Sequence, residues 1–121
     1  MSNGDLCRIL RHGTTRQRAE AILRDGPDPN FVEPGENTGS AEGFSTSPPE
    51  GPFPTGTPEK VAADKANLFP NEGGPAIVEI EVPIEIADLA DLGGEYRFEP
   101  GYGLEELLAI WPTIPKRILE P

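Results

Sequence analysis

The chain has 121 residues and a formal net charge of −11 at pH 7. A chain of this length buries about two-thirds of its unfolded surface, which suffices for one hydrophobic core, so we expect a single domain over residues 1–121. A surface this acidic repels nucleic-acid phosphates, so we do not expect a nucleic acid as partner. No apolar run approaches the ~20 residues that span a bilayer, and no signal-peptide pattern opens the chain; we therefore expect a cytoplasmic protein without a membrane partner.

A single cysteine and a single histidine limit the chemistry that the chain can perform. With Cys7 alone, neither an intrachain disulfide nor a cysteine-based zinc site can form, and with His12 alone a multi-histidine metal site is excluded. Cys7 lies in an apolar stretch, so we expect a small core residue and not a nucleophile.

The first elements that the sequence predicts are a strand and a helix. Residues 6–10 form a short apolar run typical of a strand. Thr14 with Gln17 three residues later matches a capping box, so a helix should begin there. Gly26 followed by Pro27 is the usual end of a helix.

Five arginines lie within the first 24 residues, whereas the remainder of the chain is acidic. They are Arg8, Arg11, Arg16, Arg18 and Arg24. Guanidinium groups bind phosphate oxygens well, so this cluster can meet a small anion such as a pyrophosphate. The same residues can equally solvate one helix face and offset the acidic bulk. The sequence leaves both interpretations open.

Residues 28–57 form a long segment rich in glycine and proline. A loop of this length inside a small domain is usually functional or disordered. We expect a short strand within it near residues 43–47. Because few large apolar residues oppose its conformational entropy, the loop should be mobile and should close over a bound ligand.

A second helix should begin at Pro58, because Thr57 provides a cap and proline suits a first helical turn. It should continue to Phe69, with Lys65 exposed to solvent on its surface. Strict alternation of apolar residues and glutamates over residues 77–82 then predicts a half-exposed strand.

The last quarter of the chain predicts a short strand over residues 95–99, a helix over residues 104–111 and a final strand over residues 116–119. Helices and strands that follow one another without regular alternation are typical of an α+β fold.

Two motifs near the start of the chain carry a family resemblance. His12-Gly13 ends the first strand, and Gly43-Phe44-Ser45-Thr46-Ser47 follows about thirty residues later. A strand that ends in histidine and glycine offers one imidazole and a bare backbone to a planar ligand. The arrangement resembles the mono-ADP-ribosyltransferase and poly-ADP-ribose-polymerase-like family, in particular its small bacterial, toxin-like members. The resemblance implies split antiparallel sheets flanked by two or three helices, with NAD as substrate. The implied NAD-binding residues are His12, Gly13, Thr14, Phe44, Ser45, Thr46, Ser47 and Phe69.

The chain departs from the family pattern around the nicotinamide. In the family the histidine bonds the adenosine ribose and the glycine backbone holds the nicotinamide amide. Lys65 stands where the polymerases have a serine that bonds the same amide, and Leu68 replaces a stacking tyrosine. Since the second tyrosine is also absent, Phe44 or Phe69 would have to substitute for it.

The family also requires a glutamate at the start of a late strand, where its charge stabilises a cationic ribose. Glu95 fits best, because it follows a double glycine and opens the predicted strand. Glu99 is the second candidate.

Three functions follow from the resemblance. The first is transfer of ADP-ribose from NAD to a protein or small-molecule acceptor, with a cognate partner protein as a further expectation. The second is a non-catalytic interaction module on the same fold. The third is an enzyme like the RNA 2′-phosphotransferases, which the acidity of the chain disfavours.

Overall fold

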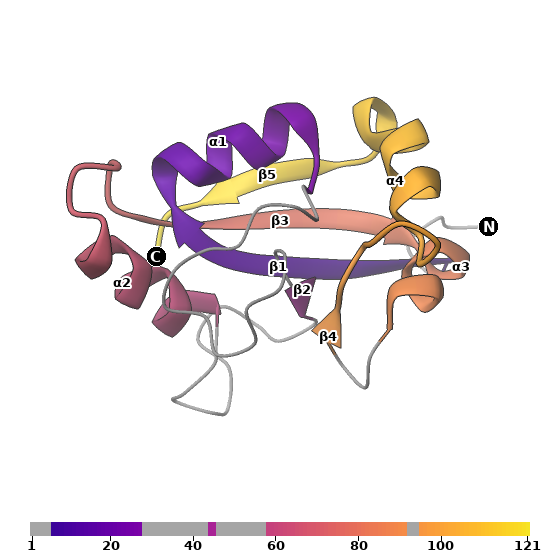
Figure 1. The fold of residues 1–121 in the computed structure, drawn as a ribbon, viewed down its shortest axis with the longest axis horizontal. Helices are drawn as coiled ribbons and strands as arrows, with labels where there is room; N and C mark the ends of the chain where they lie inside the picture. Colours follow the sequence, from indigo (N-terminus) through magenta and orange to yellow (C-terminus); the bar gives the residue numbers. More distant parts are fainter. Residues whose placement is uncertain (1–5, 28–43, 46–57, 92–94) are drawn as a thin grey trace.

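The structure, a computed structural model, describes residues 6–27, 44–45, 58–91 and 95–121. These residues form one antiparallel sheet in the order β4-β2-β1-β3-β5, with helices packed against it (Figure 1). The strands are β1 (Cys7–Thr15), β2 (Phe44–Ser45), β3 (Pro75–Pro83), β4 (Glu95–Tyr96) and β5 (Lys116–Leu119). The helices are α1 (Arg16–Asp25), α2 (Pro58–Leu68), α3 (Ile84–Ala87) and α4 (Leu104–Ile110), with the 3-10 helices η2 (Asp88–Ala90) and η3 (Trp111–Thr113).

Helices combined with antiparallel strands confirm the predicted α+β class. The expected division into split sheets is not seen among the described strands, which form one sheet. β1 joins the two sides of the sheet, because all nine of its residues pair with β3 and Arg11 also pairs with Ser45 of β2. The predicted glycine- and proline-rich loop over residues 28–57 lies outside the described residues apart from β2. The predictions for Thr46 and Ser47, and for closure of the loop over a ligand, fall on residues that the structure does not describe.

The first strand is longer than predicted, and the helix cap falls one residue later. β1 continues to Thr15 because it pairs residue by residue with β3, from Cys7 opposite Pro83 to Thr15 opposite Pro75. The hydroxyl of Thr15 accepts a hydrogen bond from the backbone nitrogen of Arg18 at 3.4 Å. Thr14 stays fully buried in the strand, so the predicted cap at Thr14 is wrong.

The end of α1 is confirmed at Gly26. This residue has a φ of 84°, which glycine adopts without strain, and its N–H donates to the carbonyl of Ile22 at 2.7 Å. A Cβ at this position would lie 2.6 Å from the side chain of Leu108. The glycine therefore both ends the helix and lets α4 pack closely against it.

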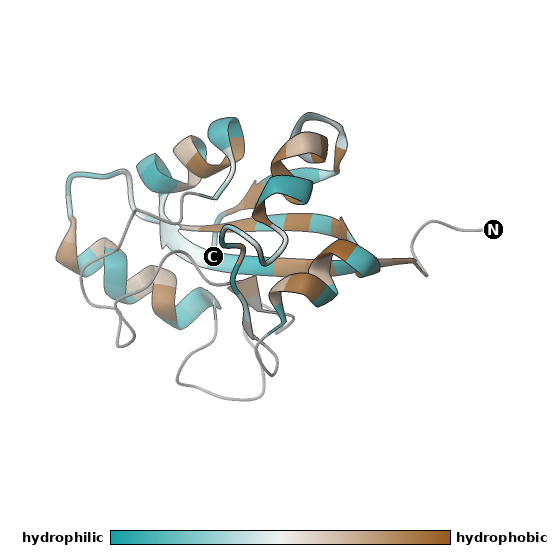
Figure 2. Cartoon of the chain, turned by 45° about the vertical axis from the view of Figure 1, so that its right-hand side comes forward, coloured by the Kyte–Doolittle hydropathy of each residue, from teal (hydrophilic) through white to brown (hydrophobic). Residues whose placement is uncertain are grey.

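One face of the sheet carries the main hydrophobic core. Alternate residues of β3, namely Val78, Ile80 and Val82, are buried on this face with Leu10 of β1. Helices α1, α3 and α4 cover them and complete the core with apolar residues from each helix. Figure 2 shows the resulting alternation of hydrophobic and hydrophilic bands along the strands. The predicted strand over residues 77–82 is thus confirmed, but the expectation of a half-exposed strand is wrong, because its four apolar residues are buried and Glu79 and Glu81 are partly buried.

The opposite face of the sheet receives α2. Gly13 and Ile77 are register partners on this face, and α2 lies over them. A Cβ on Gly13 would lie 2.1 Å from the backbone oxygen of Pro58 and 2.9 Å from the backbone nitrogen of Ala62. Because Gly13 has no side chain, α2 can approach β1 closely at this position.

The C-terminal elements follow the predictions with one addition. The helix from Leu104 and the final strand Lys116–Leu119 are confirmed, whereas the strand that begins at Glu95 has only two residues. Helices α3 and η2 were not predicted, although the three-residue spacing of the buried Ala87 and Ala90 is a helical signal. Of the helices that the structure describes, none is long and apolar enough to cross a membrane.

Candidate functional site at the junction of three strands

Five polar residues occupy matching register positions across the sheet, and three of them, Arg11, Glu79 and Arg117, lie on the face that carries α2. Each member pairs with the next across neighbouring strands, although the five are scattered over more than a hundred residues of sequence. From β4 to β5 the row reads Glu95, Ser45, Arg11, Glu79 and Arg117. Two motifs of the predicted NAD site, the serine strand and the first glutamate candidate, therefore occupy adjacent positions in this row.

An ion-pair network holds the centre of the polar row. Glu79 accepts hydrogen bonds from Nε of Arg11 at 2.9 Å and from Nε of Arg117 at 2.7 Å. Only 17% of the Arg11 side chain and 13% of the Glu79 side chain are exposed. Partial burial of Glu79 raises the pKa of its carboxyl, but the hydrogen bonds and charges of Arg117 and Arg11 outweigh this effect and leave the pKa below its ordinary value. The carboxylate is therefore ionised at neutral pH and positions Arg11.

His12 lies one residue further along β1 and faces the opposite side of the sheet. The residue is 3% exposed. Its ring centroid lies 5.4 Å from that of Phe44, which in turn makes an edge contact with Phe98 at 6.1 Å. The imidazole thus belongs to an aromatic cluster on the core face.

Gly13 and Lys65 form the second contact of interest. The Lys65 ammonium donates a hydrogen bond to the backbone oxygen of Gly13 at 3.0 Å, and the residue is 3% exposed. The expectation of a solvated Lys65 is therefore wrong. The helical turn of α2 that carries Lys65 lies directly against β1, where the missing side chain of Gly13 leaves room for it.

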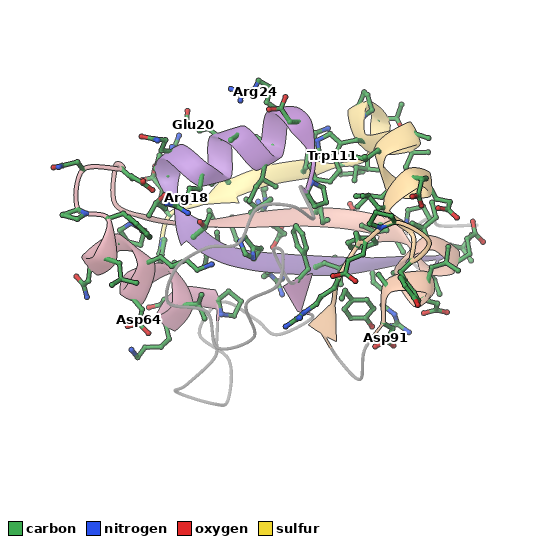
Figure 3. All side chains as sticks on the ribbon, viewed as in Figure 1. Arg18, Glu20, Arg24, Asp64, Asp91 and Trp111 are labelled. Atoms are coloured by element: carbon green, nitrogen blue, oxygen red, sulfur yellow. The ribbon has the colours of Figure 1, made fainter. Side chains whose placement is uncertain are left out.

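Phe69 lies at the end of α2 and contacts α1. The guanidinium carbon of Arg18 lies 4.1 Å from the centroid of the Phe69 ring. The same guanidinium donates from Nε to Glu72 at 2.7 Å, and Glu72 also accepts a hydrogen bond from the hydroxyl of Thr15 at 2.8 Å. This cluster ties α1 to the connection between α2 and β3; Figure 3 labels its arginine, Arg18, beside α1. Arg18 thus has structural partners on another element. This contact favours neither anion binding nor solvation of a helix face, the two roles that the sequence left open for this arginine.

The two glutamate candidates occupy different environments. Glu95 begins β4 and pairs with Ser45. Glu99 lies beyond the strand in a turn before α4, where its carbonyl accepts a hydrogen bond from the backbone nitrogen of Tyr102 at 2.8 Å. The strand register therefore favours Glu95.

The structure brings the backbones of His12, Gly13 and Ser45 together on neighbouring strands. Thr14 is fully buried in β1, and Phe44 is fully buried against His12. That His12, Gly13 and Ser45 bind one ligand stays a prediction.

Sequence reasoning did not single out Glu79 for this site, and it named Arg11 only as one of five arginines that can meet a small anion or solvate a helix face. The available signal was a glutamate in the middle of an alternating apolar strand and an arginine directly before the histidine. Their pairing depends on the strand register, which no local pattern in the sequence reveals.

The remaining candidate groups do not add a nucleophile or a metal site. Burial raises the pKa of the Cys7 thiol, and the charges of Glu81 and Glu85 raise it further, so its thiolate is scarce at neutral pH. Within the four described ranges, no group of three histidine, cysteine, aspartate or glutamate side chains is placed to hold a metal ion.

No family model matches the chain, and no curated protein or solved structure shows significant similarity to it.

Proposed function

We propose that the protein transfers ADP-ribose from NAD to an acceptor at the junction of β1, β2 and β4. The observation that carries this proposal is the strand register. Glu95 pairs with Ser45, and Ser45 pairs with Arg11, the residue before His12 and Gly13. Three motifs that are far apart in the sequence thus lie on three adjacent strands. The resemblance of these short motifs to those of the ADP-ribosyltransferase-like family supports the same assignment.

The chemistry assigned to the site is the cleavage of the bond between C1′ of ribose and N1 of nicotinamide. Nicotinamide leaves as a neutral molecule with the bonding electron pair, and the acceptor oxygen or nitrogen bonds to C1′ and loses its proton. Positive charge grows on the ribose before the acceptor arrives. The carboxylate of Glu95 is proposed to stabilise that charge, which a fixed negative group does better than water.

The family resemblance implies that the nicotinamide amide binds at the backbone of Gly13, which in this chain lies under α2 beside the buried Lys65. A carbonyl oxygen has two lone pairs, so the Gly13 oxygen can accept from the amide while it keeps its hydrogen bond from Lys65. Phe44 is buried against His12, and Phe69 is in contact with Arg18, so we assign neither ring to the place of the missing tyrosines.

The decisive experiment measures nicotinamide release from NAD by the purified full chain, with water as acceptor. Glu95→Gln should lower the turnover about 100-fold or more, because one fixed group that stabilises the transition-state charge contributes about that much. The dissociation constant for NAD should change by less than about threefold, since the charge matters mainly as the bond breaks. Glu99→Gln is the matched control and should keep its turnover.

Each outcome of this experiment has a distinct meaning. If Glu99→Gln loses turnover and Glu95→Gln does not, the catalytic assignment to Glu95 is wrong. If NAD at ~100 times its dissociation constant adds the expected 2.7 kcal/mol of stability but is not cleaved, the chain is a non-catalytic binding module. If NAD neither stabilises the protein nor is cleaved, the proposed function is wrong.

A further inference from the structure

A groove with a volume of about 690 Å³ lies between α1 and the segment that leads into and includes β5. This volume falls within the range of about 300–1,000 Å³ that is usual for ligand-binding clefts, but the groove is shallow and open to solvent. None of its lining residues belongs to the NAD site proposed above. The groove is therefore separate from the proposed NAD site.

The wall that α1 contributes is basic. Arg16, Glu20 and Arg24 line it at spacings of four residues, which places them on one side of the helix, with Leu23 beside them. Figure 3 shows Glu20 and Arg24 on the outer side of α1, away from the sheet. Together with Lys116 on the opposite wall, the lining has three cations and one carboxylate, in a chain whose net charge is −11.

The opposite wall is an edge strand. β5 ends the sheet order, and among the described strands only β3 pairs with it. Lys116 and Ile118 alternate along β5 and line the groove with Ile114 and Pro115. The Lys116 ammonium is held by the carbonyls of Trp111 at 2.7 Å and Ile114 at 3.4 Å, so its charge has a fixed place.

We propose that this groove binds an extended acidic peptide segment of a partner protein, which adds a strand to the edge of β5. An unpaired strand edge offers main-chain hydrogen bonds to an incoming strand, and a flanking groove reads its alternate side chains. Over its four residues β5 presents about 13 Å of backbone.

Among the cations that line the groove, Lys116 contacts the carbonyl oxygens of Trp111 and Ile114, so its charge favours an acidic occupant. Within about 8–10 Å, the screening length at physiological salt, the local cations act more strongly on a bound peptide than distant acids do. Arg24 pairs with Asp25, and Arg16 pairs with both Glu20 and Glu120; all these side chains are largely exposed except that of Arg16, which is 38% exposed. Exposed ion pairs contribute little stability, so a glutamate of the peptide can replace either partner at small cost.

The test uses an acetylated and amidated octapeptide of alternating valine and glutamate, titrated into the isotope-labelled full chain. We expect amide shifts in β5 and α1, and binding that weakens at least about fivefold when the salt is raised from 0.05 to 0.5 M. The analogue with a fully N-methylated backbone, which keeps the charges but lacks main-chain donors, should not bind. A valine-lysine octapeptide should not bind either.

Two charge-reversal variants test the location of the site. Arg24→Glu should weaken the valine-glutamate peptide at least about fivefold, because it replaces one attraction with one repulsion. Arg8→Glu is the matched control, an exposed arginine of β1 outside the groove, and should bind the peptide as the wild type does.

Four results would overturn the proposal. They are the absence of amide shifts in β5 up to about 2 mM peptide, equal binding of the N-methylated or lysine analogue, and equal effects of the two charge reversals. The fourth is a set of β5 shifts that depends on protein concentration without peptide, which would make a second copy of the chain the occupant. NAD cleavage is independent of every one of these results.

Discussion

At the scale of single residues, the polar groups that the fold buries are the most informative ones. Glu79 and Lys65 look alike in the sequence, as charged members of an exposed strand face and an exposed helix face. In the structure each is largely covered, and each has a defined partner on another element. Partly buried charges that lose their partner cost more than exposed ones, so these two positions should be sensitive to substitution.

Glu79→Gln should lower the free energy of unfolding by about 1–2 kcal/mol at pH 7, since it removes the charge shared by Arg11 and Arg117. The folded-state pKa of Glu79 lies below the ordinary value of 4.5. The wild type therefore has this stabilisation at pH values above 4.5 and loses it as the pH falls toward the lower folded-state pKa.

Urea unfolding at a series of pH values between about 7 and 3 measures both effects. The difference between wild type and Glu79→Gln should shrink as the pH falls below the ordinary value of 4.5. A difference that stays constant over this range would contradict the role of the ionised carboxylate.

Lys65→Met should lower the free energy of unfolding by about 1 kcal/mol, because the Gly13 carbonyl loses a charged donor while the volume of the side chain is roughly kept. Lys60→Met is the control on the same helix, since its ion pair with Asp64 is exposed. The control should change stability by less than about 0.5 kcal/mol. If Lys65→Met is as stable as the wild type, the free energy needed to bury the ammonium equals the stabilisation from its hydrogen bond, and the prediction is wrong.

At the scale of the elements, the contact between α2 and β1 depends on one missing side chain. Gly13 lies beneath the first turns of α2, with backbone atoms of Pro58 and Ala62 closer to its Cα than a side chain would allow. The helix cannot move aside without losing its cover of Ile77, which is fully buried. Strand β1 thus serves both faces of the sheet, with Leu10 and His12 toward one core and Gly13 toward the other.

Gly13→Ala should lower the free energy of unfolding by about 1–3 kcal/mol, because the added methyl group collides with backbone atoms of α2. Amide hydrogen exchange should become faster in both β1 and α2. Ala63→Gly, on the exposed side of α2, is the control: it should cost about 1 kcal/mol through helix propensity and leave exchange in β1 unchanged. If amide exchange in α2 is unchanged in the Gly13→Ala variant, α2 can shift away from the added methyl group at little cost in free energy, and the prediction is wrong.

At the scale of the whole molecule, charge is the dominant property. A net charge of −11 on 121 residues makes the folded state repel itself. The described ion pairs partly relieve this repulsion, and the arginines of the first 24 residues are the main local source of positive charge. Salt screens both the repulsion and the exposed ion pairs, but the repulsion involves more charges.

Raising sodium chloride from about 0.02 to 0.3 M should therefore stabilise the protein by about 1 kcal/mol, or about 4 °C in Tm. Thermal unfolding followed by circular dichroism measures the shift. A fall in Tm over this range would mean that the ion pairs outweigh the general repulsion.

The sequence by itself determined the α+β class and most of the elements. The alternation over residues 77–82 and the glycine-proline end of α1 are local signals, because each depends only on the period of the chain or on one backbone conformation. The cap of α1 was predicted one residue early, because the pairing of β1 with β3 continues past Thr14 and overrides the local capping pattern.

Only the tertiary structure decided which distant residues meet. The row of Glu95, Ser45 and Arg11 depends on strand order and register. A shift of one residue would move each of them to the other face of the sheet. In the same way, Lys65 is buried because Gly13, fifty-two residues earlier, has no side chain to keep the helix away. Such contacts join segments whose local patterns are independent, and the free energy that selects them arises only when the whole core is packed.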